Sequence, residues 1–348
     1  MPTAIDIRNL TLPVLTAQLQ AIGEKSFRAK QIYEWLWQKS ARSFDEMTNL
    51  SIELRAKLQA NFLLRPVRLH SQQISRDGTI KCGFILHDNH LIEGVLIPAE
   101  DRMTACVSSQ VGCSLTCKFC ATGKLERLRN LDASEIYDQV VMIRNLCMET
   151  YQKPLTNIVY MGMGEPLLNY SNMLLSTELI SSEMGLGMAA KRITVSTAGI
   201  AKMIQKLGDD GVRFNLALSL HAANDQKRSQ IMPINEHNSL DVLAEALRYF
   251  HNKTGSRITF EYIVFHGFND ELEDARELAA FCKNVPCKVN LIEYNPIEEG
   301  GFINAKEDKI ESFSRFLESR NIIVNIRRSR GKDIDAACGQ LANKGTKN

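Results

Sequence analysis

Three cysteines stand close together in the sequence, Cys113, Cys117 and Cys120, in the spacing CxxxCxxC. Thiolates this close on one short loop are suited to binding a metal. A structural zinc site needs four protein ligands, and no further CxxC or HxxxH pair in the sequence offers the fourth. A four-iron cluster held by three cysteines keeps one iron open to another ligand. The spacing therefore favours an iron–sulfur cluster, with a zinc knuckle as the alternative.

The remaining cysteines carry less information on their own. The chain has nine cysteines, an odd number, and its start, MPTAIDIRNL, carries Asp6 and lacks the basic start followed by an apolar stretch that a secretory signal has. We therefore expect a cytoplasmic protein with reduced thiols. Cys82, Cys147, Cys282 and Cys287 are expected to be small buried core residues. For Cys106, in an apolar strand, a core role and a catalytic role both stay open.

Composition limits the class of protein. With 348 residues, 44% hydrophobic and 24% charged, the chain fits one large globular domain or a large and a small one. No apolar run approaches the roughly 18 to 20 residues of a membrane-spanning helix, so we expect no membrane association. The net charge is only +2. Residues 1–70 and 321–348 each carry +4 around a middle of −6, which permits nucleic acid at the ends without establishing it.

Strands and helices alternate from residue 104 onward, which predicts a parallel sheet with helical crossovers, either a barrel or an open doubly wound sheet. The predicted strands are Thr104–Ser108, Asn157–Met161, Arg192–Thr197, Val212–Ser219, Arg257–Phe265, Cys287–Tyr294 and Asn321–Arg327. The predicted helices lie near residues 132–150, 170–184, 199–208, 238–253, 270–283 and 305–320. In both architectures chemistry belongs at the carboxyl ends of the strands.

Polar motifs lie at those predicted strand ends. They are Gly112–Cys120, Gly162–Pro166, Ser196, Ser219–His221 and Asn295–Pro296. Their placement predicts that residues far apart in the sequence meet at one edge of the sheet, beside the cysteine loop.

The first 65 residues predict short helices, because Ile32, Trp35 and Leu36 share one helical face and Leu54 and Leu58 share another. The basic residues on the outside of these helices are Arg28, Lys30, Lys39, Arg42, Arg55 and Lys57. A solvated helical face and an RNA-binding face are both compatible with them. Residues 66–103 alternate like strands. We expect a basic helical domain over 1–65, a connecting β segment over 66–103 and a core domain over 104–348.

The CxxxCxxC motif, with Phe119 before its third cysteine, resembles the signature of the radical S-adenosylmethionine (radical SAM) superfamily. The sequence resembles more narrowly the RlmN family of ribosomal RNA adenine-C2 methyltransferases, over nearly the whole chain. The motifs that carry this are Ala121-Thr-Gly123, Arg129-Asn-Leu131, Met161–Pro166, Ser219-Leu-His221 and Gly331–Leu341. The sister group, Cfr-type C8 methyltransferases, shares most of them, while Glu165-Pro166 and Arg328–Gly331 look closer to RlmN. Lys124-Leu-Glu126 departs from the glycine-containing version expected there.

The resemblance implies a partial (β/α)6 TIM-like radical SAM barrel with a small helical N-terminal domain. It implies a [4Fe–4S] cluster on Cys113, Cys117 and Cys120, whose open iron binds S-adenosylmethionine, two molecules being used per turnover. The residues it assigns to S-adenosylmethionine are Gly164, Glu165, Ser196, Ser219, Leu220, His221 and Asn295.

The same resemblance implies three catalytic residues. Adenine C2 is not nucleophilic, so a methyl group reaches it by a radical route. Cys338 is methylated, loses a hydrogen atom to a 5′-deoxyadenosyl radical and adds to C2, which joins protein to RNA. Cys106 then resolves the adduct by forming a disulfide with Cys338. Glu93 matches a position that accepts a proton, although in its own context it also suits an ordinary exposed strand residue.

The surroundings of Cys338 support a reactive thiol. It lies between Ala337 and Gly339, close in sequence to Arg327, Arg328, Arg330 and Lys332, and we expect these cations to favour its thiolate. The basic residues proposed as phosphate contacts are Lys124, Arg127, Arg129, Arg327, Arg328 and Arg330.

The resemblance implies adenosine 2503 of 23S rRNA as the target. Adenosine 37 of some transfer RNAs is a further target that the sequence leaves open. The expected electron donor is a reductant such as flavodoxin or ferredoxin, and we expect a monomer. Two alternatives remain: C8 methylation of the same adenine, and a non-catalytic iron–sulfur or zinc RNA-binding protein, in which Cys106 and Cys338 would have no purpose.

Overall fold

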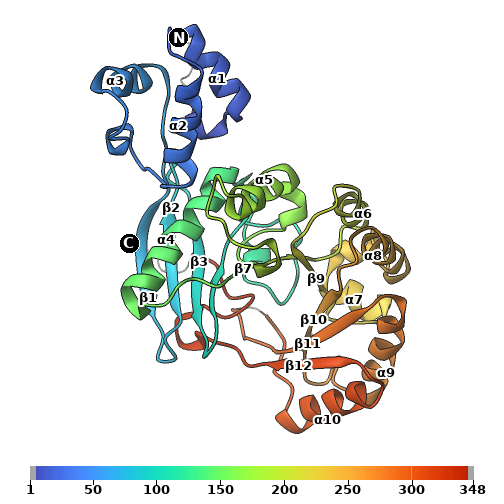
Figure 1. Ribbon diagram of the computed structural model, residues 1–348. Helices are drawn as coiled ribbons and strands as arrows, with labels where there is room; N and C mark the ends of the chain where they lie inside the picture. Colours follow the sequence, from blue (N-terminus) through green and yellow to red (C-terminus); the bar gives the residue numbers. More distant parts are fainter. Residues whose placement is uncertain (1–4, 299, 344–348) are drawn as a thin grey trace.

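The computed structural model describes residues 5–298 and 300–343, so residues 1–4 and 344–348, at the outer ends of the predicted first and last domains, lie outside the described part. The fold is built on one ten-stranded sheet with the order β1-β2-β3-β4-β7-β8-β9-β10-β11-β12 (Figure 1). From β4 to β12 neighbouring strands are parallel. These strands are β4 (Met103–Cys106), β7 (Asn157–Tyr160), β8 (Ile193–Thr197), β9 (Asn215–Ser219), β10 (Ile258–Val264), β11 (Cys287–Glu293) and β12 (Ile323–Arg327).

Each crossover between the parallel strands carries a helix. The crossover helices are α4 (Ala133–Tyr151), α5 (Tyr170–Ser181), α6 (Ala201–Asp209), α7 (Asp225–Ile231), α8 (Leu240–Thr254), α9 (Leu272–Phe281) and α10 (Glu307–Glu318). All residues of β10 are buried, as expected for a strand covered on both faces. The sheet curves with α6 to α10 along its outer side, and the predicted partial barrel is confirmed (Figure 1). Every predicted crossover helix is present; α7 is an additional short one.

The β segment after the helical domain is part of the same sheet. Strands β1 (Arg68–Ile74), β2 (Ile80–Ile85) and β3 (Leu91–Pro98) pair antiparallel with one another, and β3 pairs antiparallel with β4. Two further short strands, β5 (Gln110–Val111) and β6 (Arg129–Asn130), form a separate pair that brackets the cysteine loop. The antiparallel strands therefore extend the barrel wall on the side where β4 carries Cys106.

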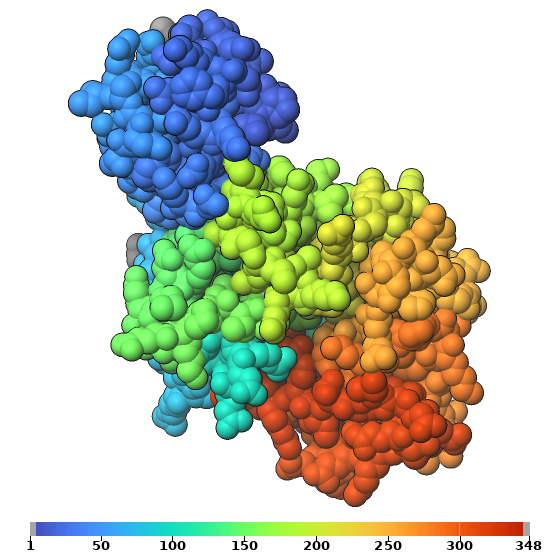
Figure 2. Space-filling view, in the orientation of Figure 1, coloured from blue at the N-terminus to red at the C-terminus, as the bar shows by residue number. Residues whose placement is uncertain are grey.

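Helices α1 (Leu12–Ala21), α2 (Phe27–Trp37) and α3 (Ile52–Asn61) form a separate lobe above α4, as Figures 1 and 2 show. A buried ion pair joins this lobe to the barrel: Arg8 Nη1 lies 2.8 Å from Asp138 Oδ2 on α4, and both side chains are at most 10% exposed. Asp138 Oδ2 also accepts a hydrogen bond from the backbone N–H of Val67. Edge-to-face packing of Trp37 on Tyr137 completes the junction.

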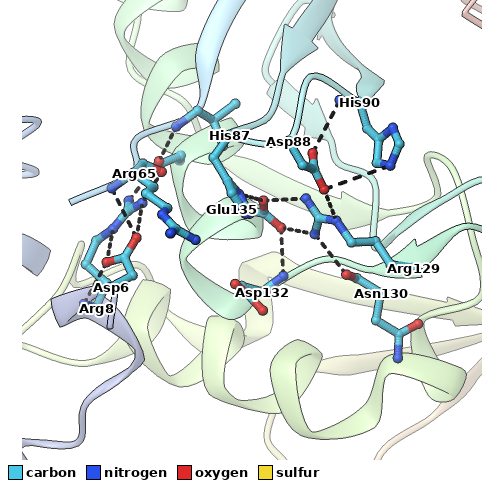
Figure 3. Close-up of polar contacts among 12 residues, drawn as sticks. Asp6, Arg8, Arg65, His87, Asp88, His90, Arg129, Asn130, Asp132 and Glu135 are labelled. Carbon is cyan, nitrogen blue, oxygen red and sulfur yellow. Dashed lines mark hydrogen bonds and ion pairs between the residues drawn. The ribbon is translucent and has the colours of Figure 1, made fainter. Parts of the chain in front are cut away.

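A second polar network fixes β6 against α4 (Figure 3). Arg129 forms a bidentate pair with Glu135 in the first turn of α4, at 2.7 and 2.8 Å, and a third ion pair with Asp88 between β2 and β3. These carboxylates raise the pKa of Arg129 against the opposing effect of burial. Because β6 pairs with β5, the network anchors both ends of the cysteine loop.

Replacing Asp138 with Ala is expected to lower the free energy of unfolding by about 3 kcal/mol, because it leaves Arg8 buried with only Asp6 as a counter-ion. Urea denaturation measures this. Glu273→Ala, which removes the exposed partner of Arg276, is the control and should cost less than about 0.5 kcal/mol. Equal effects of the two substitutions would show that the buried pair does not hold the lobe to the barrel.

Candidate active site

The predicted site residues on the parallel strands do converge at the carboxyl edge of the sheet. Ser196 on β8 and Ser219 on β9 end neighbouring strands, and their hydroxyl oxygens lie 3.3 Å apart. Glu165 follows β7 and Asn295 follows β11, and both side chains are buried. Residues that span 130 positions of sequence thus meet on one face of the barrel, as the strand-end rule predicts.

The cysteine loop lies over this edge. The backbone N–H of Lys118 donates to the carbonyl of Ile231, and the ring of Phe119 packs edge-to-face on His221 with 4.7 Å between ring centroids. Burial, opposed by a backbone hydrogen bond from Leu115, raises the pKa of Cys113 to about 11. Burial and the neighbouring thiols Cys120 and Cys113 raise the pKa of Cys117. Three thiols that influence one another from a single loop fit ligands that share one metal centre.

The geometry of the thiols bears on the zinc alternative. Among residues 5–298 and 300–343, no three Cys, His, Asp or Glu side chains are grouped closely enough to hold a single metal ion. In an iron–sulfur cluster each cysteine binds a different iron, so its ligands need not converge on one point. The arrangement is therefore compatible with the predicted cluster.

Gly164 and Glu165 form a tight turn after β7. Gly164 has φ +94°, and a Cβ there would lie 2.5 Å from Cβ of Gln110, so only glycine fits. The Glu165 carboxylate accepts backbone hydrogen bonds from Leu167 at 3.0 Å and Ala198 at 2.8 Å. Burial nonetheless raises the pKa of Glu165. The turn presents a buried carboxyl beside the cysteine loop, and Glu165 influences the pKa of both Cys113 and Cys117.

His221 is held as a neutral ring. Its Nδ1 accepts a hydrogen bond from the backbone N–H of Ile263 at 3.0 Å, which leaves Nε2 as the protonated nitrogen. Its backbone lies in the left-handed region, with φ 55°, and its carbonyl accepts from the Asn269 side chain at 2.7 Å. Burial and the charge of Arg228 lower the pKa of His221 to about 3. Leu220, the preceding residue, is fully buried.

The depressed pKa of His221 predicts acid sensitivity. Below its ordinary pKa of 6.5 the unfolded chain binds a proton that the native ring excludes, down to a pH of about 3. The free energy of unfolding should therefore fall as the pH decreases from 6.5, by about 2 kcal/mol at pH 5. Urea titrations between pH 5 and 7 test this against His221→Asn, because asparagine can accept from Ile263, tolerates a positive φ and does not titrate. Parallel curves for the two proteins would contradict the assignment.

The loop that carries Cys338 is fastened to the barrel mouth. The side-chain amide of Asn295 donates to the carbonyl of Cys338 at 3.2 Å. The backbone N–H of Ala121 donates to the carbonyl of Gly339, and the Thr122 hydroxyl donates to the carbonyl of Leu341 at 2.6 Å. The C-terminal loop is thus attached directly to the segment that follows Cys120.

Cys106 and Cys338 lie close enough for their charges to interact, although 231 residues separate them in the sequence. Arg327 at the end of β12 interacts with both thiols and is held by Glu261 on β10 at 3.0 Å. Burial and the charge of Cys338 raise the pKa of Cys106 to about 12.

Of the four cations expected to favour the Cys338 thiolate, only Arg327 acts on it, and burial outweighs its effect. Cys338 is exposed at the mouth of the site, yet desolvation by the surrounding protein raises its pKa to about 11, and the charge of Arg327 only reduces this increase. Arg328 and Lys332 pair instead with Glu293, at 2.9 and 2.7 Å.

Glu93 on β3 is buried, which removes the interpretation of an exposed strand residue. Its carboxylate lies 3.6 Å from Lys81 Nζ and accepts backbone hydrogen bonds from Ala342 at 2.9 Å and Asn343 at 3.1 Å. Glu93 therefore holds the segment that follows the Cys338 loop, from the strand that pairs with the one carrying Cys106.

Residues 5–64 match the family described as the ribosomal RNA large subunit methyltransferase N-terminal domain, and residues 107–279 match the radical SAM superfamily. A Cytophaga hutchinsonii protein named "Probable dual-specificity RNA methyltransferase RlmN" is 64% identical over 98% of this chain and 93% of its own length. The chain belongs to the RlmN family of radical SAM methyltransferases.

More distant relatives agree. A Bacillus subtilis protein with the same name is 46% identical over 92% of this chain and 88% of its own length. The crystal structure of a radical SAM methyltransferase from Sphaerobacter thermophilus is 41% identical, with a TM-score of 0.91 over 97% of this chain and 99% of that one. Members of this superfamily use a [4Fe–4S] cluster and S-adenosylmethionine, and the three thiols on the Cys113–Cys120 loop fit that cluster.

Sequence reasoning missed Arg228 on α7. This buried guanidinium donates to the carbonyls of Ala198 at 2.6 Å and Leu220 at 3.1 Å, which ties the loops after β8 and β9 together. It also lowers the pKa of Cys117 against the larger effect of burial. In the sequence Arg228 is only an arginine between two predicted strands, and such arginines are too common for this one to be selected.

The candidate phosphate contacts separate into two groups. Arg129, Arg327 and Arg328 form ion pairs inside the protein. Lys124, Arg127 and Arg330 are exposed near the site. In the RlmN-type helical lobe, Lys39 and Lys57 pair with acidic neighbours, whereas Lys25 and Lys30 are exposed beside Phe27, whose side chain is 51% exposed.

Proposed function

We propose that this chain methylates C2 of adenosine 2503 in 23S rRNA, and adenosine 37 of some transfer RNAs, through a methylated cysteine and a covalent protein–RNA adduct. The relatives are named dual-specificity RNA methyltransferases, which supports an RNA substrate of two kinds. The observation that carries the proposal is the attachment of the Cys338 loop to Asn295 and to the segment after Cys120, which brings Cys338 to the barrel mouth, where its charge also acts on Cys106.

The roles of the cofactor residues follow from position. Cys113, Cys117 and Cys120 would hold the cluster, and Gly164, Glu165, Ser196, Ser219, Leu220, His221 and Asn295 would hold S-adenosylmethionine. When bound, these groups supply a methyl group and a 5′-deoxyadenosyl radical. His221 and the buried carboxyl of Glu165 can each offer polar atoms to the cofactor at the strand ends. The ring of His221 stays neutral near neutral pH, because its pKa is lowered to about 3.

The two further thiols divide the remaining work. Cys338, exposed on its loop, carries the one-carbon unit to the base, and buried Cys106 approaches it from β4. Arg327 stands beside both and favours the thiolate that must form when Cys106 attacks the Cys338 sulfur. Glu93 lies behind the loop and is the proposed acceptor of the C2 proton; its bonds to Ala342 and Asn343 must then open for it to reach the base.

Access of the base sets requirements on the RNA. An adenine must leave its stack to reach a thiol at the barrel mouth, which single-stranded or junction RNA makes less costly.

Among the described residues no helix is both long and apolar enough to cross a membrane. We propose a cytoplasmic monomer that receives electrons from a reductant such as flavodoxin or ferredoxin.

The regiochemistry tests the proposal. Protein reconstituted anaerobically with iron and sulfide is incubated with 23S rRNA fragments, S-adenosylmethionine and a reductant. The digested nucleosides are then separated and analysed by mass spectrometry. 2-Methyladenosine supports the proposal. 8-Methyladenosine would assign the C8 reaction instead, and stoichiometric zinc without cleavage of S-adenosylmethionine would assign a binding protein.

Replacing both Lys25 and Lys30 with Gln is expected to weaken RNA binding and to reduce the slope of log K against log salt concentration by about 2, one unit for each lost phosphate contact. Cleavage of S-adenosylmethionine without RNA should be unchanged. The matched control replaces the exposed Lys202 and Lys253, on α6 and α8, far from the lobe in Figure 1. An unchanged slope would make the lobe surface an ordinary solvated face.

A further inference from the structure

A cavity of about 510 Å³ opens at the amino-terminal ends of β10, β11 and β12, the end of the barrel opposite the cysteine loop. Pro286 and Ile323 form part of its apolar wall, with Phe316 from α10. Its volume lies within the range of small-molecule sites. The reaction proposed above uses none of the residues that line it.

The charge of the cavity has one sign. Its lining includes four cations, Arg257, Arg276, Lys283 and Arg320, and no described Asp or Glu. Arg276 pairs with Glu273 outside the cavity, and Arg320 lies over the ring of Phe316. Cations near helix C-termini also complement helix dipoles, so charge alone assigns no function. Four cations without a described acidic residue in the lining do favour a ligand that carries carboxylates.

Two thiols also line this cavity. Cys282 ends α9 and Cys287 begins β11, five residues later, and Cys287 Sγ lies 3.6 Å from the carbonyl oxygen of Cys282. Cys282 is buried, whereas Cys287 is half-buried and therefore reachable. The interaction between the two thiols, together with the charge of Arg257, lowers the pKa of Cys287 against the opposing effect of burial, and the same interaction together with burial raises the pKa of Cys282. Both were expected to be inert core residues, and neither behaves as an isolated one.

We propose that this cavity is a redox-modification site, in which a small disulfide carrying carboxylates reacts first with Cys287 and Cys282 then resolves the product to an intramolecular disulfide. The inference does not depend on the RNA reaction, because the site lies at the other end of the barrel.

The proposed exchange balances as follows. The Cys287 thiolate attacks one sulfur of the small disulfide RSSR, which breaks the S–S bond, forms Cys287–S–S–R and releases RS⁻. Cys282 then loses its proton to solvent and attacks the Cys287 sulfur, which forms the Cys282–Cys287 bond and releases a second RS⁻. Two protein thiols are oxidised and one disulfide is reduced to two thiols, which take up the two protons at their own pKa.

The first experiment maps the bond. Cluster-loaded protein is reduced, desalted anaerobically, treated with glutathione disulfide, quenched with acid and digested with trypsin. Cleavage after Arg276, Lys283 and Lys288 places Cys282 and Cys287 on separate peptides, 277–283 and 284–288. We expect these peptides joined in the natural protein, a glutathione adduct on 284–288 in Cys282→Ser, and at least tenfold slower modification of 277–283 in Cys287→Ser. A lasting adduct in the natural protein, or equal modification of the two variants, would overturn the order of attack.

The second experiment tests the role of the cavity. Cystamine is a disulfide with positive charges. Its rate of reaction with the protein is compared with that of glutathione disulfide, after each rate is divided by the rate at which the same disulfide reacts with a small free thiol. We expect glutathione disulfide to react about tenfold faster at low salt and this preference to fall towards unity at about 0.5 M salt. Replacing Arg257 and Arg320 with Gln should remove the preference. Equal normalised rates at low salt would show that the cavity does not select an anionic disulfide, even if the two thiols can be joined.

Discussion

Protein with Cys338 replaced by Ala is expected to form no methylated adenosine and no covalent adduct with RNA, although it binds the cluster and S-adenosylmethionine. The reason is that in the proposed mechanism the Cys338 sulfur carries the carbon atom that reaches C2, and no other described thiol is exposed at the mouth of the site. The loss of product should be at least about 10³-fold, the size found when a group that forms a covalent intermediate is removed.

Protein with Cys106 replaced by Ala is expected to stop later. Its Cys338 can still be methylated and can still add to the base, because in the proposed mechanism Cys106, on β4, takes no part in those steps. The adduct then persists, since no thiol is left to displace the Cys338 sulfur. A denaturing gel of the isolated protein should show a slower band that RNase removes.

The difference between the two variants is the measurement that matters. Cys147→Ala, which removes a buried thiol on α4 away from the site, is the control and should retain product formation and show no RNase-sensitive band. Cross-links in both variants, or turnover by either, would mean that the roles of Cys106 and Cys338 are misassigned. The radical SAM assignment would survive that result, because it rests on the cysteine loop and the family.

Much of the barrel was predictable because parallel strands buried on both faces leave a strong signal. β10 is a mostly apolar, fully buried run in the sequence, β11 becomes buried over its last three residues, and a helical period follows each strand. The sheet order then follows from right-handed crossovers between sequential strands. This is why Ser196, Ser219 and Asn295 could be placed at one edge from sequence alone.

What could not be predicted depends on contacts between distant segments. Arg228 looks like any arginine in a crossover, and its importance arises only because α7 points it at the carbonyls of two different strand loops. Arg129 looks like a phosphate contact, but Asp88 and Glu135, from separate elements, neutralise it. Ion pairs of this kind have no local periodicity, so no sequence pattern reveals them.

The prediction of a stabilised Cys338 thiolate overestimated the cations for a related reason. Four cations near it in sequence suggest a stabilised thiolate, but Arg328 and Lys332 are directed to Glu293, and desolvation outweighs the charge of Arg327. A thiol with a pKa of about 11 is mostly protonated at neutral pH. Its reactivity towards alkylating agents should therefore be low until a cofactor or substrate changes its surroundings.

Replacing Cys117 with Ala is expected to abolish both cluster binding and cleavage of S-adenosylmethionine. Cys117 is the middle thiol of the three proposed ligands: burial, together with its neighbours Cys120 and Cys113, raises its pKa. Two thiolates on a loop open to solvent cannot hold four irons against competing thiols and water. Iron and sulfide analysis after anaerobic reconstitution, with chromatography of 5′-deoxyadenosine, measures both losses.

The same measurements on Cys147→Ala separate loss of a ligand from loss of any cysteine. That variant should keep about four irons and four sulfides per chain and full cleavage, because its thiol donates only to the carbonyl of Lys153 on the outside of the barrel. Cys117→Ala should also remain folded, since its side chain contributes to the smaller apolar cluster around Phe119 only from the edge. A folded Cys117→Ala protein that retains the cluster and cleaves S-adenosylmethionine would contradict the assignment of the CxxxCxxC cysteines as cluster ligands. The proposed roles of Cys106 and Cys338 would then lose their source of radicals.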